Sequence, residues 1–424
     1  MCGISGIISK QGHPDKNDII KMNGMISHRG PDQSGYLEYK NTLLGHARLS
    51  VIDISDNGRQ PMSTDGRYWI IFNGEVYNFL EIKEELIKRN YNFYSKTDTE
   101  VVINSYIEWG DACFNKFNGD WVIAILDKQT NFITIARDGL GCKPCYIYED
   151  SKTIAFSSEI KGLLGIKQDL EFDKLNFGIA PTTLFSCSKT IFKNVTQLPP
   201  GRILRINLIN YNKELIRWWY PLENLPPINP NYEINQGEYY ELLYDATKLR
   251  LNADLKIGTS LSGGLDSSVI FVILNLIQNN ENFLNDKKID LNPIIVNFSG
   301  CQTSSEAVEI SKKFKRDLKV LEFKDKKINE VMMLCAKLEV VEEYFMQPML
   351  YQNQKNSGIH ISIDGHGADE FLGLPSFLPH LSLSAHNQIA SLRSASDDFG
   401  NKKVQSVIND FFGNFAQSKT KAGY

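Results

Sequence analysis

The chain has 424 residues, with 46 Lys and Arg against 50 Asp and Glu, and a formal net charge of −4. Its length predicts two or three domains, and its 42% hydrophobic and 23% charged residues exclude a disordered or collagen-like chain. The near-neutral charge gives no general basic field for nucleic acid, and no apolar run approaches the roughly 20 residues that span a bilayer. We therefore expect a multidomain protein with neither a nucleic-acid nor a membrane partner.

The seven cysteines are scattered along the chain and odd in number. This pattern disfavours a secreted disulfide framework. The N-terminus has no charged region ahead of its short apolar stretch and no small-residue cleavage site, both of which a signal peptide would have. These observations favour a cytoplasmic location.

The first half, up to about residue 208, consists mainly of short β-type runs separated by turn residues. Helical patterns are limited to residues 79–88 and 99–109, and Thr97 or Asp98 could cap the second of these helices. The expected strands are residues 4–8, 42–44, 68–72, 121–126, 132–136, 145–148 and 153–156. This half is predicted to be an α+β domain dominated by antiparallel sheet.

Cys2 follows the initiator methionine, whose removal is expected because the next residue is small. The thiol would then lie beside a free α-amine. The reference pKa of an α-amine, about 7.7–8.0, suits it to act as a general base. Any protein can have cysteine as its second residue, so the position alone proves no function. The flexible start at Gly3, which runs into a strand, favours a nucleophile somewhat.

Five short motifs in this half together carry a family resemblance. They are Cys2-Gly3-Ile4, His28-Arg29-Gly30-Pro31-Asp32, His46-Ala47-Arg48-Leu49-Ser50, Asn73-Gly74-Glu75-Val76-Tyr77-Asn78 and Ser158-Glu159-Ile160-Lys161. Each is weak alone, but in this order they resemble the class II glutamine amidotransferase domain. The resemblance implies the fold of an N-terminal-nucleophile hydrolase, an α+β sandwich with antiparallel sheets between helices.

The resemblance assigns the catalytic roles in glutamine hydrolysis to three residues. It makes Cys2 the nucleophile. Attack of a thiolate on a carboxamide develops a negative oxygen that needs preorganised donors. The resemblance supplies these donors from the Asn73 side chain and the Gly74 backbone N–H.

The same resemblance assigns the glutamine-binding residues, which also include Asn73 and Gly74. The planar guanidinium of Arg48 suits the α-carboxylate of glutamine, and the matching positions for its α-ammonium are Glu75 and Asp98. An isolated arginine or aspartate would more often be a surface ion-pair partner or a helix cap. The two histidines of the motifs, His28 and His46, are expected to be structural hydrogen-bonding groups.

The run Cys142-Lys143-Pro144-Cys145 has the spacing of a redox or metal-binding pair. No second such pair accompanies it, and its surroundings match a family segment in which the cysteine positions vary. We favour a structural interpretation, with oxidation to a disulfide left open.

Residues 217–236 hold a run rich in proline and aromatic residues that breaks both strand and helix patterns. We therefore predict a domain at 1–208, a linker at 209–236 and a second domain at 237–424. Strands and helices alternate beyond the linker, which predicts a parallel sheet with crossover helices. The expected helices are residues 239–249, 267–277, 305–315 and 327–338, and the expected strands are 257–261, 293–298, 319–323 and 359–363.

A glycine- and serine-rich loop follows the first of these strands and precedes a helix. Its sequence is Ser262-Gly263-Gly264-Leu265-Asp266-Ser267-Ser268. Glycines let the backbone approach a phosphate, and the helix N-terminus and hydroxyls bind its oxygens. The loop matches neither the Walker nor the dinucleotide pattern. It resembles the pyrophosphate loop of ATP pyrophosphatases, which belong to the adenine nucleotide α-hydrolase-like α/β fold. A glycine-rich turn without a ligand is the alternative.

A second loop, Asp364-Gly365-His366-Gly367-Ala368-Asp369-Glu370, resembles a loop of the asparagine synthetase family. The resemblance implies a Mg²⁺ site at Asp266 and Asp369, since Mg²⁺ prefers carboxylate and phosphate oxygens. It places the adenine near backbone groups of Leu261 and Val296. The implied ATP-binding residues are Leu261, Ser262, Gly263, Gly264, Leu265, Asp266, Ser267, Ser268, Val296, Asp364 and Gly365.

The two halves together resemble a glutamine-hydrolysing asparagine synthetase. The resemblance implies that Cys2 releases ammonia from glutamine. Ammonia then reaches a carboxylate, aspartate or another acid, that ATP has activated as its adenylate, giving the amide, AMP and pyrophosphate. Glutamine, ATP, Mg²⁺ and a carboxylic acid are the implied substrates and cofactors, and a homodimer is expected from the resemblance alone.

The sequence departs from the family pattern in its second half. The prototypical synthetase has an acidic residue in place of His366 and a serine in place of Asp364. Only 54 residues follow Glu370, where the family continues with a long helical region that carries a catalytic lysine. We therefore expect a shortened ATP domain.

Several alternatives to an asparagine synthetase stay open. The chain could be a glutaminase that supplies ammonia, with an ATP domain that is impaired or completed by a partner. It could also be an amidotransferase for a non-aspartate acid in a specialised pathway. A ring-closing adenylating enzyme or a non-enzymatic scaffold is disfavoured, because the motif residues around Cys2 are retained.

Overall fold

The computed structural model describes residues 1–177, 188–223, 231–280, 289–298, 302–323, 328–339 and 346–367. The chain divides into two compact units, one of Met1–Glu171 with Phe192–His366 and one of Phe172–Ile191 with Gly367–Tyr424. The described part of the second unit includes one short helix, α5 (Lys174–Phe177). Asp369, one of the two expected Mg²⁺ ligands, lies outside the described residues.

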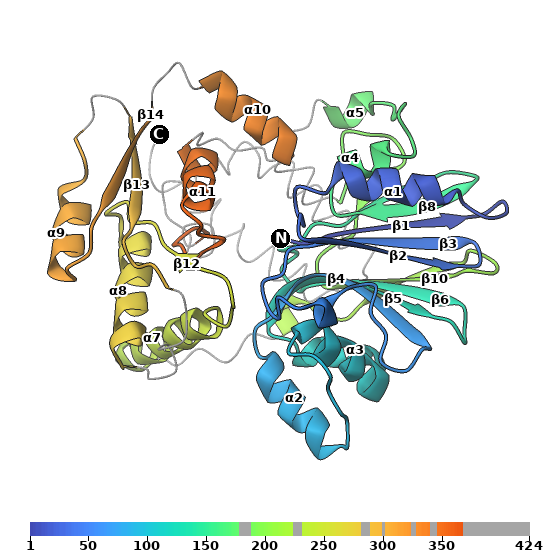
Figure 1. The fold of residues 1–424 in the computed structure, drawn as a ribbon, viewed down its shortest axis with the longest axis horizontal. Coiled ribbons are helices and arrows are strands. Elements are labelled where there is room, and N and C mark those ends of the chain that lie inside the picture. Colours follow the sequence, from blue (N-terminus) through green and yellow to red (C-terminus); the bar gives the residue numbers. More distant parts are fainter. Residues whose placement is uncertain are drawn as a thin grey trace, which may run out of the picture. The chain divides into compact units, whose positions relative to one another are not determined.

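The first half of the chain contains two antiparallel sheets, which lie face to face in Figure 1. The six-stranded sheet has the order β2 (Gln33–Tyr39), β3 (Thr42–Arg48), β1 (Gly3–Ser9), β8 (Thr153–Ser157), β7 (Tyr146–Glu149) and β9 (Val195–Gln197). The five-stranded sheet has the order β11 (Lys213–Arg217), β10 (Arg202–Asn207), β6 (Phe132–Arg137), β5 (Gly119–Asp127) and β4 (Tyr68–Val76). This confirms the expected antiparallel architecture.

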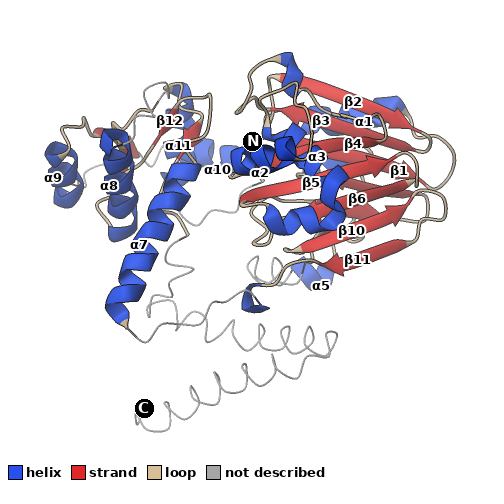
Figure 2. Cartoon of the chain, turned by 90° about the horizontal axis from the view of Figure 1, so that it is seen from below, coloured by secondary structure: helices blue, strands red, loops and turns tan. Residues whose placement is uncertain are grey.

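Helices cover the outer face of each sheet (Figures 1 and 2). The six-stranded sheet carries α1 (Lys16–Met25) and α4 (Ile160–Leu164), and the five-stranded sheet carries α2 (Phe79–Lys88) and α3 (Asp98–Trp109). Because side chains alternate along a strand, β1 serves two cores. Ile4 and Ile8 point into the core between the sheets, while Ile7 packs under α1 and α4. The predicted sandwich of two sheets between helices is therefore confirmed.

Parallel pairing distinguishes the second half. Strand β12 (Ile257–Gly258) pairs with β15 (Ile361–Ser362), and β13 (Ile294–Phe298) pairs with β14 (Lys319–Phe323), both in parallel. A parallel bridge between Ser260 and Ile294 joins the two pairs. The helices are α7 (Tyr232–Leu249), α8 (Leu265–Asn280), α9 (Ser305–Lys313), α10 (Ile328–Leu338) and α11 (Met346–Asn356). The predicted parallel α/β arrangement is confirmed for the described residues.

Strand β11 lies inside the stretch that was expected to be a linker, and helix α7 begins within it. Strand β11 pairs with β10, so the predicted boundary at residue 208 falls between two strands of one sheet. Lys213, Glu214 and Leu215 are exposed, which explains why β11 shows no apolar face in the sequence. Helix α7 begins earlier than expected because the Asn231 side chain caps it by accepting a hydrogen bond from Glu233 N.

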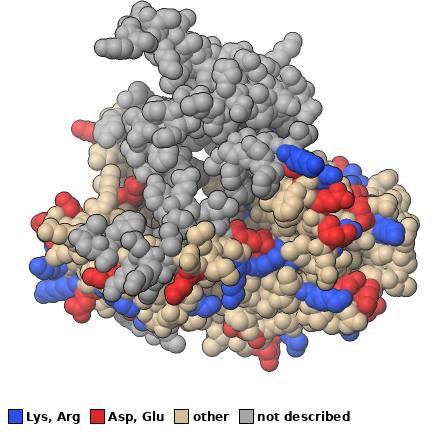
Figure 3. All heavy atoms as spheres, turned by 90° about the horizontal axis from the view of Figure 1, so that it is seen from above, with Lys and Arg blue, Asp and Glu red and all other residues tan. Residues whose placement is uncertain are grey.

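The surface carries charges of both signs. On the face shown in Figure 3, the described Lys and Arg side chains are interspersed with Asp and Glu. Within the described part of the chain, none of the helices combines the length and apolar character needed to cross a membrane.

Candidate functional site

One cavity brings together all the residues that the sequence assigned to glutamine. Its lining includes Cys2, Arg48, Asn73, Gly74, Glu75 and Asp98. These residues come from four places in the fold: the start of β1, the end of β3, the second half of β4 and the first turn of α3. The cavity therefore depends on both sheets and on one helix, and no single segment of the chain forms it.

The Cys2 thiol is held beside the end of β3. Its Sγ accepts a hydrogen bond from Leu49 N at 3.4 Å. Burial raises the pKa of this thiol, and the neighbouring amino terminus acts in the opposite direction. Burial lowers the pKa of the amino group of Met1 to about 6, and the charges of Arg29 and Lys143 contribute to that lowering. Once Met1 is removed, the amine of Cys2 would be the candidate general base, a role that only a neutral amine can fill.

Asn73 and Gly74 have the properties that an oxyanion site requires. The Asn73 side chain is fully buried, and neither its Nδ2 nor its Oδ1 has a hydrogen-bond partner among the described residues. Because Asn73 lines the cavity, its amide is available to donate to a negative oxygen there. Gly74 has φ of +154°, and a Cβ there would lie 2.2 Å from Asp120 O. Only glycine fits this close pairing of β4 with β5.

Arg48 is more heavily engaged than the sequence suggested. Its Nη1 donates to Gln33 Oε1 at 2.9 Å and to Ser55 O at 2.8 Å, and its Nη2 donates to the carbonyls of Ile52 and Asp53. The Nε–H is thus the guanidinium donor without a partner among the described residues. A bidentate grip on a carboxylate would require Arg48 to release some of these carbonyls.

Two carboxylates, those of Glu75 and Asp98, line the cavity. Burial, reinforced by the charge of Asp98, raises the pKa of Glu75 to about 7. Burial likewise raises the pKa of Asp98 to about 6, although hydrogen bonds such as that from Val76 N oppose it. A bound ammonium would favour the ionised forms of both groups. The pair is therefore suited to the α-ammonium of an amino acid.

Lys143 lines the same cavity, and the sequence analysis did not assign it a role. Two buried residues hold its turn in place. The Asp138 carboxylate accepts from Cys142 N at 2.9 Å and Lys143 N at 3.1 Å, and Arg137 donates to the carbonyls of Gly141 and Lys143. The sequence signal that could have indicated this turn is the pair of opposite charges at 137–138 beside the glycines of the turn.

The remaining candidates in the first half have structural surroundings. The His46 ring bonds the Phe72 carbonyl through Nε2 at 3.0 Å, and this contact joins the two sheets. Burial lowers the pKa of His46 to about 4, so the ring is neutral at pH 7. His28 contacts Glu159 rather than the cavity. Cys142 and Cys145 are free thiols, the first exposed and the second buried.

The phosphate loop (residues 262–268) lies where the sequence placed it, at the start of α8. Gly263 has φ of +87°, and Ser262 Oγ lies 2.8 Å from Ser267 Oγ. Ser268 Oγ donates to Gly264 O at 2.7 Å. Glycines, hydroxyls and the N-terminus of a 16-residue helix form a donor set that fits phosphate oxygens.

The second loop packs directly against the phosphate loop. A Cβ on Gly365 would lie 2.6 Å from Ser267 N, so only glycine permits this approach. Asp364 Oδ1 accepts from Ser260 N at 3.0 Å and from Ser260 Oγ at 2.6 Å, which ties the loop to the parallel sheet. His366 Nδ1 lies 3.0 Å from Tyr351 Oη.

The other expected ATP-binding residues differ in exposure. Leu261 is buried beside β13, and Val296 lies within β13. Leu265 is 79% exposed at the start of α8. Asp266 is in the first turn of α8, which places one carboxylate within the phosphate loop. Among the described residues, no three His, Cys, Asp or Glu side chains converge as a metal site would require.

Two known families match consecutive parts of the chain. A glutamine amidotransferase domain matches residues 1–219, and an asparagine synthase domain matches residues 238–422.

Individual relatives match about two thirds of this chain. A putative glutamine-hydrolysing asparagine synthetase of Methanocaldococcus jannaschii is 38% identical over 306 residues, covering 65% of this chain and 57% of that protein. Glutamine-hydrolysing asparagine synthetase 1 of Bacillus subtilis is 34% identical over 283 residues, covering 64% and 43%. Amidase chry2 of Gibberella zeae is 30% identical over 287 residues, covering 64% and 42%. The chain spans about half the length of these curated relatives.

Among solved structures, the glutamine phosphoribosylpyrophosphate amidotransferase of B. subtilis is 13% identical with a TM-score of 0.38, covering 85% of this chain and 71% of that one. A likeness of that size carries no argument. The family matches and the gathering of Cys2, Asn73 and the two carboxylates in one cavity agree. The chain belongs to the glutamine amidotransferase family, and an asparagine synthase domain follows the amidotransferase domain.

Proposed function

We propose that this chain is a glutamine-dependent amidotransferase. The observation that carries the proposal is the fully buried, unpartnered amide of Asn73 in the same cavity as the Cys2 thiol and two carboxylates. Such a cavity offers a nucleophile, an oxyanion donor and a cation-binding pair at once. A primary amide with a free α-amino group is the substrate that uses all three.

The hydrolysis divides into two steps at Cys2. The α-amine of the processed chain takes the thiol proton, and Sγ attacks the side-chain carbonyl carbon of glutamine. The Asn73 side chain and the Gly74 N–H stabilise the developing oxyanion. Ammonia leaves with a proton, and water then hydrolyses the thioester to release glutamate. Glu75 and Asp98 orient the substrate through its α-ammonium, and Arg48 supplies positive charge for its α-carboxylate.

The second half would use the ammonia for amide synthesis. ATP supplies an adenylate leaving group on the acceptor carboxylate. The phosphate loop and the N-terminus of α8 would hold the phosphate groups, and Asp266 and Asp369 would hold Mg²⁺. The expected products are the amide, AMP and pyrophosphate. A cytoplasmic homodimer is part of the proposal on family resemblance.

The acceptor acid is the open part of this proposal. Aspartate is the first candidate, because relatives of this chain are named asparagine synthetases. A second candidate is a different acid, since a relative of similar coverage is named an amidase and His366 replaces an acidic family residue. The remaining alternative has no acceptor acid on this chain: a glutaminase that delivers ammonia to a partner.

A screen with the full chain separates these candidates. Glutamine, ATP and Mg²⁺ are incubated with a panel of carboxylic acids that includes aspartate, and glutamate and pyrophosphate are measured. Pyrophosphate that depends on one acid identifies the acceptor, and glutamate without pyrophosphate supports the glutaminase alternative. Absence of glutamate from every mixture would contradict the proposal.

A substitution at Cys2 tests the two-site scheme. Cys2→Ala should abolish amide synthesis from glutamine but retain synthesis from added ammonia. Cys142→Ala is the matched control, because it removes an exposed free thiol that does not line the cavity. Equal loss of both activities in Cys2→Ala would count against two separate sites.

A further inference from the structure

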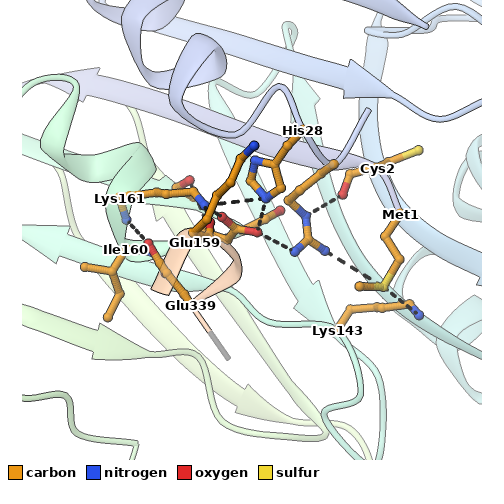
Figure 4. A network of polar contacts seen from close by, with 12 residues as sticks. Met1, Cys2, His28, Lys143, Glu159, Ile160, Lys161 and Glu339 are labelled. Atoms are coloured by element: carbon orange, nitrogen blue, oxygen red, sulfur yellow. Dashed lines mark hydrogen bonds and ion pairs between the residues drawn. The ribbon is translucent and has the colours of Figure 1, made fainter. Parts of the chain in front are cut away.

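The Ser158–Lys161 motif contains a buried carboxylate that the proposed function does not use. Glu159 is 3% exposed, and its Oε1 accepts from Arg29 Nη1 at 2.8 Å. The same oxygen lies 3.0 Å from His28 Nε2, and Oε2 forms an ion pair with Lys161 Nζ at 2.7 Å (Figure 4). Three nitrogen-bearing side chains thus converge on one carboxylate.

Glu159 is ionised throughout the useful pH range. Burial alone would raise the pKa of this carboxyl, but hydrogen bonds from His28, Lys161 and Arg29 outweigh burial and lower its pKa to about 2. A buried charge paired with cations is costly to disturb, since removal of one partner leaves the other uncompensated. The cluster is therefore a fixed point in the fold.

Arg29 connects this fixed point to the nucleophile. Its Nε donates to the main-chain carbonyl of Cys2 at 2.8 Å, while its Nη1 is held by Glu159. Arg29 is itself buried, at 9% exposed, so its guanidinium has little freedom to move. One planar group thus spans from the carbonyl of Cys2 to the carboxylate of Glu159.

The residue before Glu159 fixes the next part of β1. Ser158 Oγ accepts from Ile4 N at 2.9 Å, and Ser158 N donates to Ile4 O at 3.0 Å. Residues 2 and 4 of the chain are therefore both tied to the 158–159 segment. A chain end has few such restraints in general, and a nucleophile on a chain end needs them.

We propose that Glu159 is a positioning residue for the nucleophile: through Arg29 it fixes the carbonyl of Cys2 and thereby aims the thiol at the substrate carbonyl beside Asn73. The inference rests on the proposed function, because positioning affects rate only if Cys2 attacks the substrate. A purely structural ion cluster would alter stability and leave the rate per folded molecule unchanged.

The first test is Glu159→Gln in the full chain. Glutamine preserves the size of the side chain and one acceptor oxygen but removes the charge that holds Arg29. We expect kcat for glutamate release to fall by about 10- to 100-fold, since small misplacements of reacting groups have effects of this size. The KM for glutamine should change less than about threefold, because Glu75, Asp98 and Arg48 keep their contacts.

Glu149→Gln provides the matched control. Glu149 also bridges two cations, Lys10 at 2.9 Å and Lys213, but it lies on β7 and does not line the cavity. Its kcat should equal that of the unmodified chain. Glu159→Asp should restore part of the kcat that Glu159→Gln loses, because it returns the charge at a shorter reach.

A second measurement does not require turnover. The rate at which iodoacetamide alkylates Cys2 is followed by mass spectrometry of the N-terminal peptide. Glu159→Gln should change this rate by at least fivefold, and Glu149→Gln should not. If the unmodified chain releases no glutamate, the proposed function fails, and the alkylation rates still decide whether Glu159 positions the thiol.

Two outcomes would overturn the inference. One is a Glu159→Gln variant with unchanged kcat and alkylation rate. The other is a variant that melts at a lower temperature but keeps the full kcat per folded molecule. Should Glu159→Gln fail to fold, Arg29→Lys gives the same test, because lysine keeps the charge and cannot bridge Cys2 and Glu159. An unchanged kcat in folded Arg29→Lys would also overturn the inference.

Discussion

The side chain of Asn73 combines full burial with an amide that bonds no described residue. This combination is costly in a resting protein and useful when a negative oxygen arrives. The asparagine was assigned from a family motif in the sequence. Its unsatisfied state could not be deduced from the sequence, because it depends on how β4 packs.

Replacement of this amide should affect the rate more than the affinity. We expect Asn73→Ala to lower kcat for glutamate release by about 10²–10³-fold, with a small change in KM, since the oxyanion exists only in the transition state. Asn104→Ala is the control, because Asn104 is also buried with an unpartnered Nδ2 and lies on α3, outside the cavity lining. Steady-state kinetics of both variants decide the matter, and an unchanged kcat in Asn73→Ala would refute an oxyanion role.

Glu75 and Asp98 predict a pH dependence of glutamine binding. Their pKa values of about 7 and about 6 mean that both carboxylates gain protons as the pH falls, and a protonated carboxyl does not attract an ammonium. The dissociation constant of glutamine should therefore rise as the pH falls through 7 and then 6, by at most about tenfold per pH unit for each group.

Calorimetry on Cys2→Ala, which cannot turn glutamine over, measures this binding. Glu75→Gln serves as the comparison and should lose the upper transition. A dissociation constant that stays level between pH 8 and 5 would contradict the assignment of these carboxylates to the α-ammonium.

At the scale of elements, sequence patterns located some segments well and missed others for identifiable reasons. Helix α2 has the predicted bounds, and Thr97 caps α3 through a hydrogen bond from Thr99 N. Strand β11 was missed because it is an edge strand with exposed side chains. Periodicity reports burial, so an element without a buried face gives no signal.

The candidate site shows the same limit. The motif residues were found because they stand in the same order as in the family pattern. Lys143 belongs to no such motif and reaches the cavity through a turn held by Arg137 and Asp138. Contacts that join distant segments, such as Arg29 to Cys2 and Glu159, have no periodic trace in the sequence. Only the folded chain reveals them.

The loop that holds Arg48 gives a prediction at this scale. A Cβ on Gly58 would lie 1.9 Å from Arg48 Nη2, so Gly58→Ala should displace the guanidinium. We expect the KM for glutamine to rise by about tenfold or more, with a smaller change in kcat, because the proposed contact of Arg48 with the α-carboxylate lies away from the reacting carbon. Kinetics at varied glutamine concentration measure this split.

Gly24→Ala is the control for this substitution. Gly24 is an exposed position in α1 where an added Cβ meets no atom within 4 Å. Its kinetics should not change, and the helix should gain about 0.5–1 kcal/mol of stability. If Gly58→Ala behaved like Gly24→Ala, Arg48 would not depend on the loop.

At the scale of the whole molecule, the two sheets of the first half are joined by more than apolar packing. His46 lies in one sheet and contacts the Phe72 carbonyl in the other. The pKa of this histidine is lowered to about 4 by burial, so the unfolded chain takes up a proton at higher pH than the folded chain does. Folding stability linked to His46 should therefore be lost as the pH falls from about 6.5 toward 4, at about 1.4 kcal/mol per pH unit.

The comparison of unmodified chain with His46→Gln isolates this contribution. The variant should be less stable at pH 7 and should lose stability less steeply below pH 6.5, as measured by denaturant unfolding followed by tryptophan fluorescence. His13→Gln, at an exposed histidine, should keep the steep dependence. Equal slopes in all three proteins would rule out His46 as the titrating group.

The position of Met1 has a practical consequence for any preparation of this protein. Its thioether sulfur lies 3.6 Å from Lys143 Nζ, which lines the cavity, and 4.0 Å from Nη2 of Arg29, which holds the Cys2 carbonyl (Figure 4). If the proposed chemistry holds, only molecules trimmed by a methionine aminopeptidase carry the working amine. Rapid overexpression or an N-terminal affinity tag would then yield a mixture of processed and unprocessed chains. Titration with a thiol-directed inhibitor would count fewer competent active sites than chains.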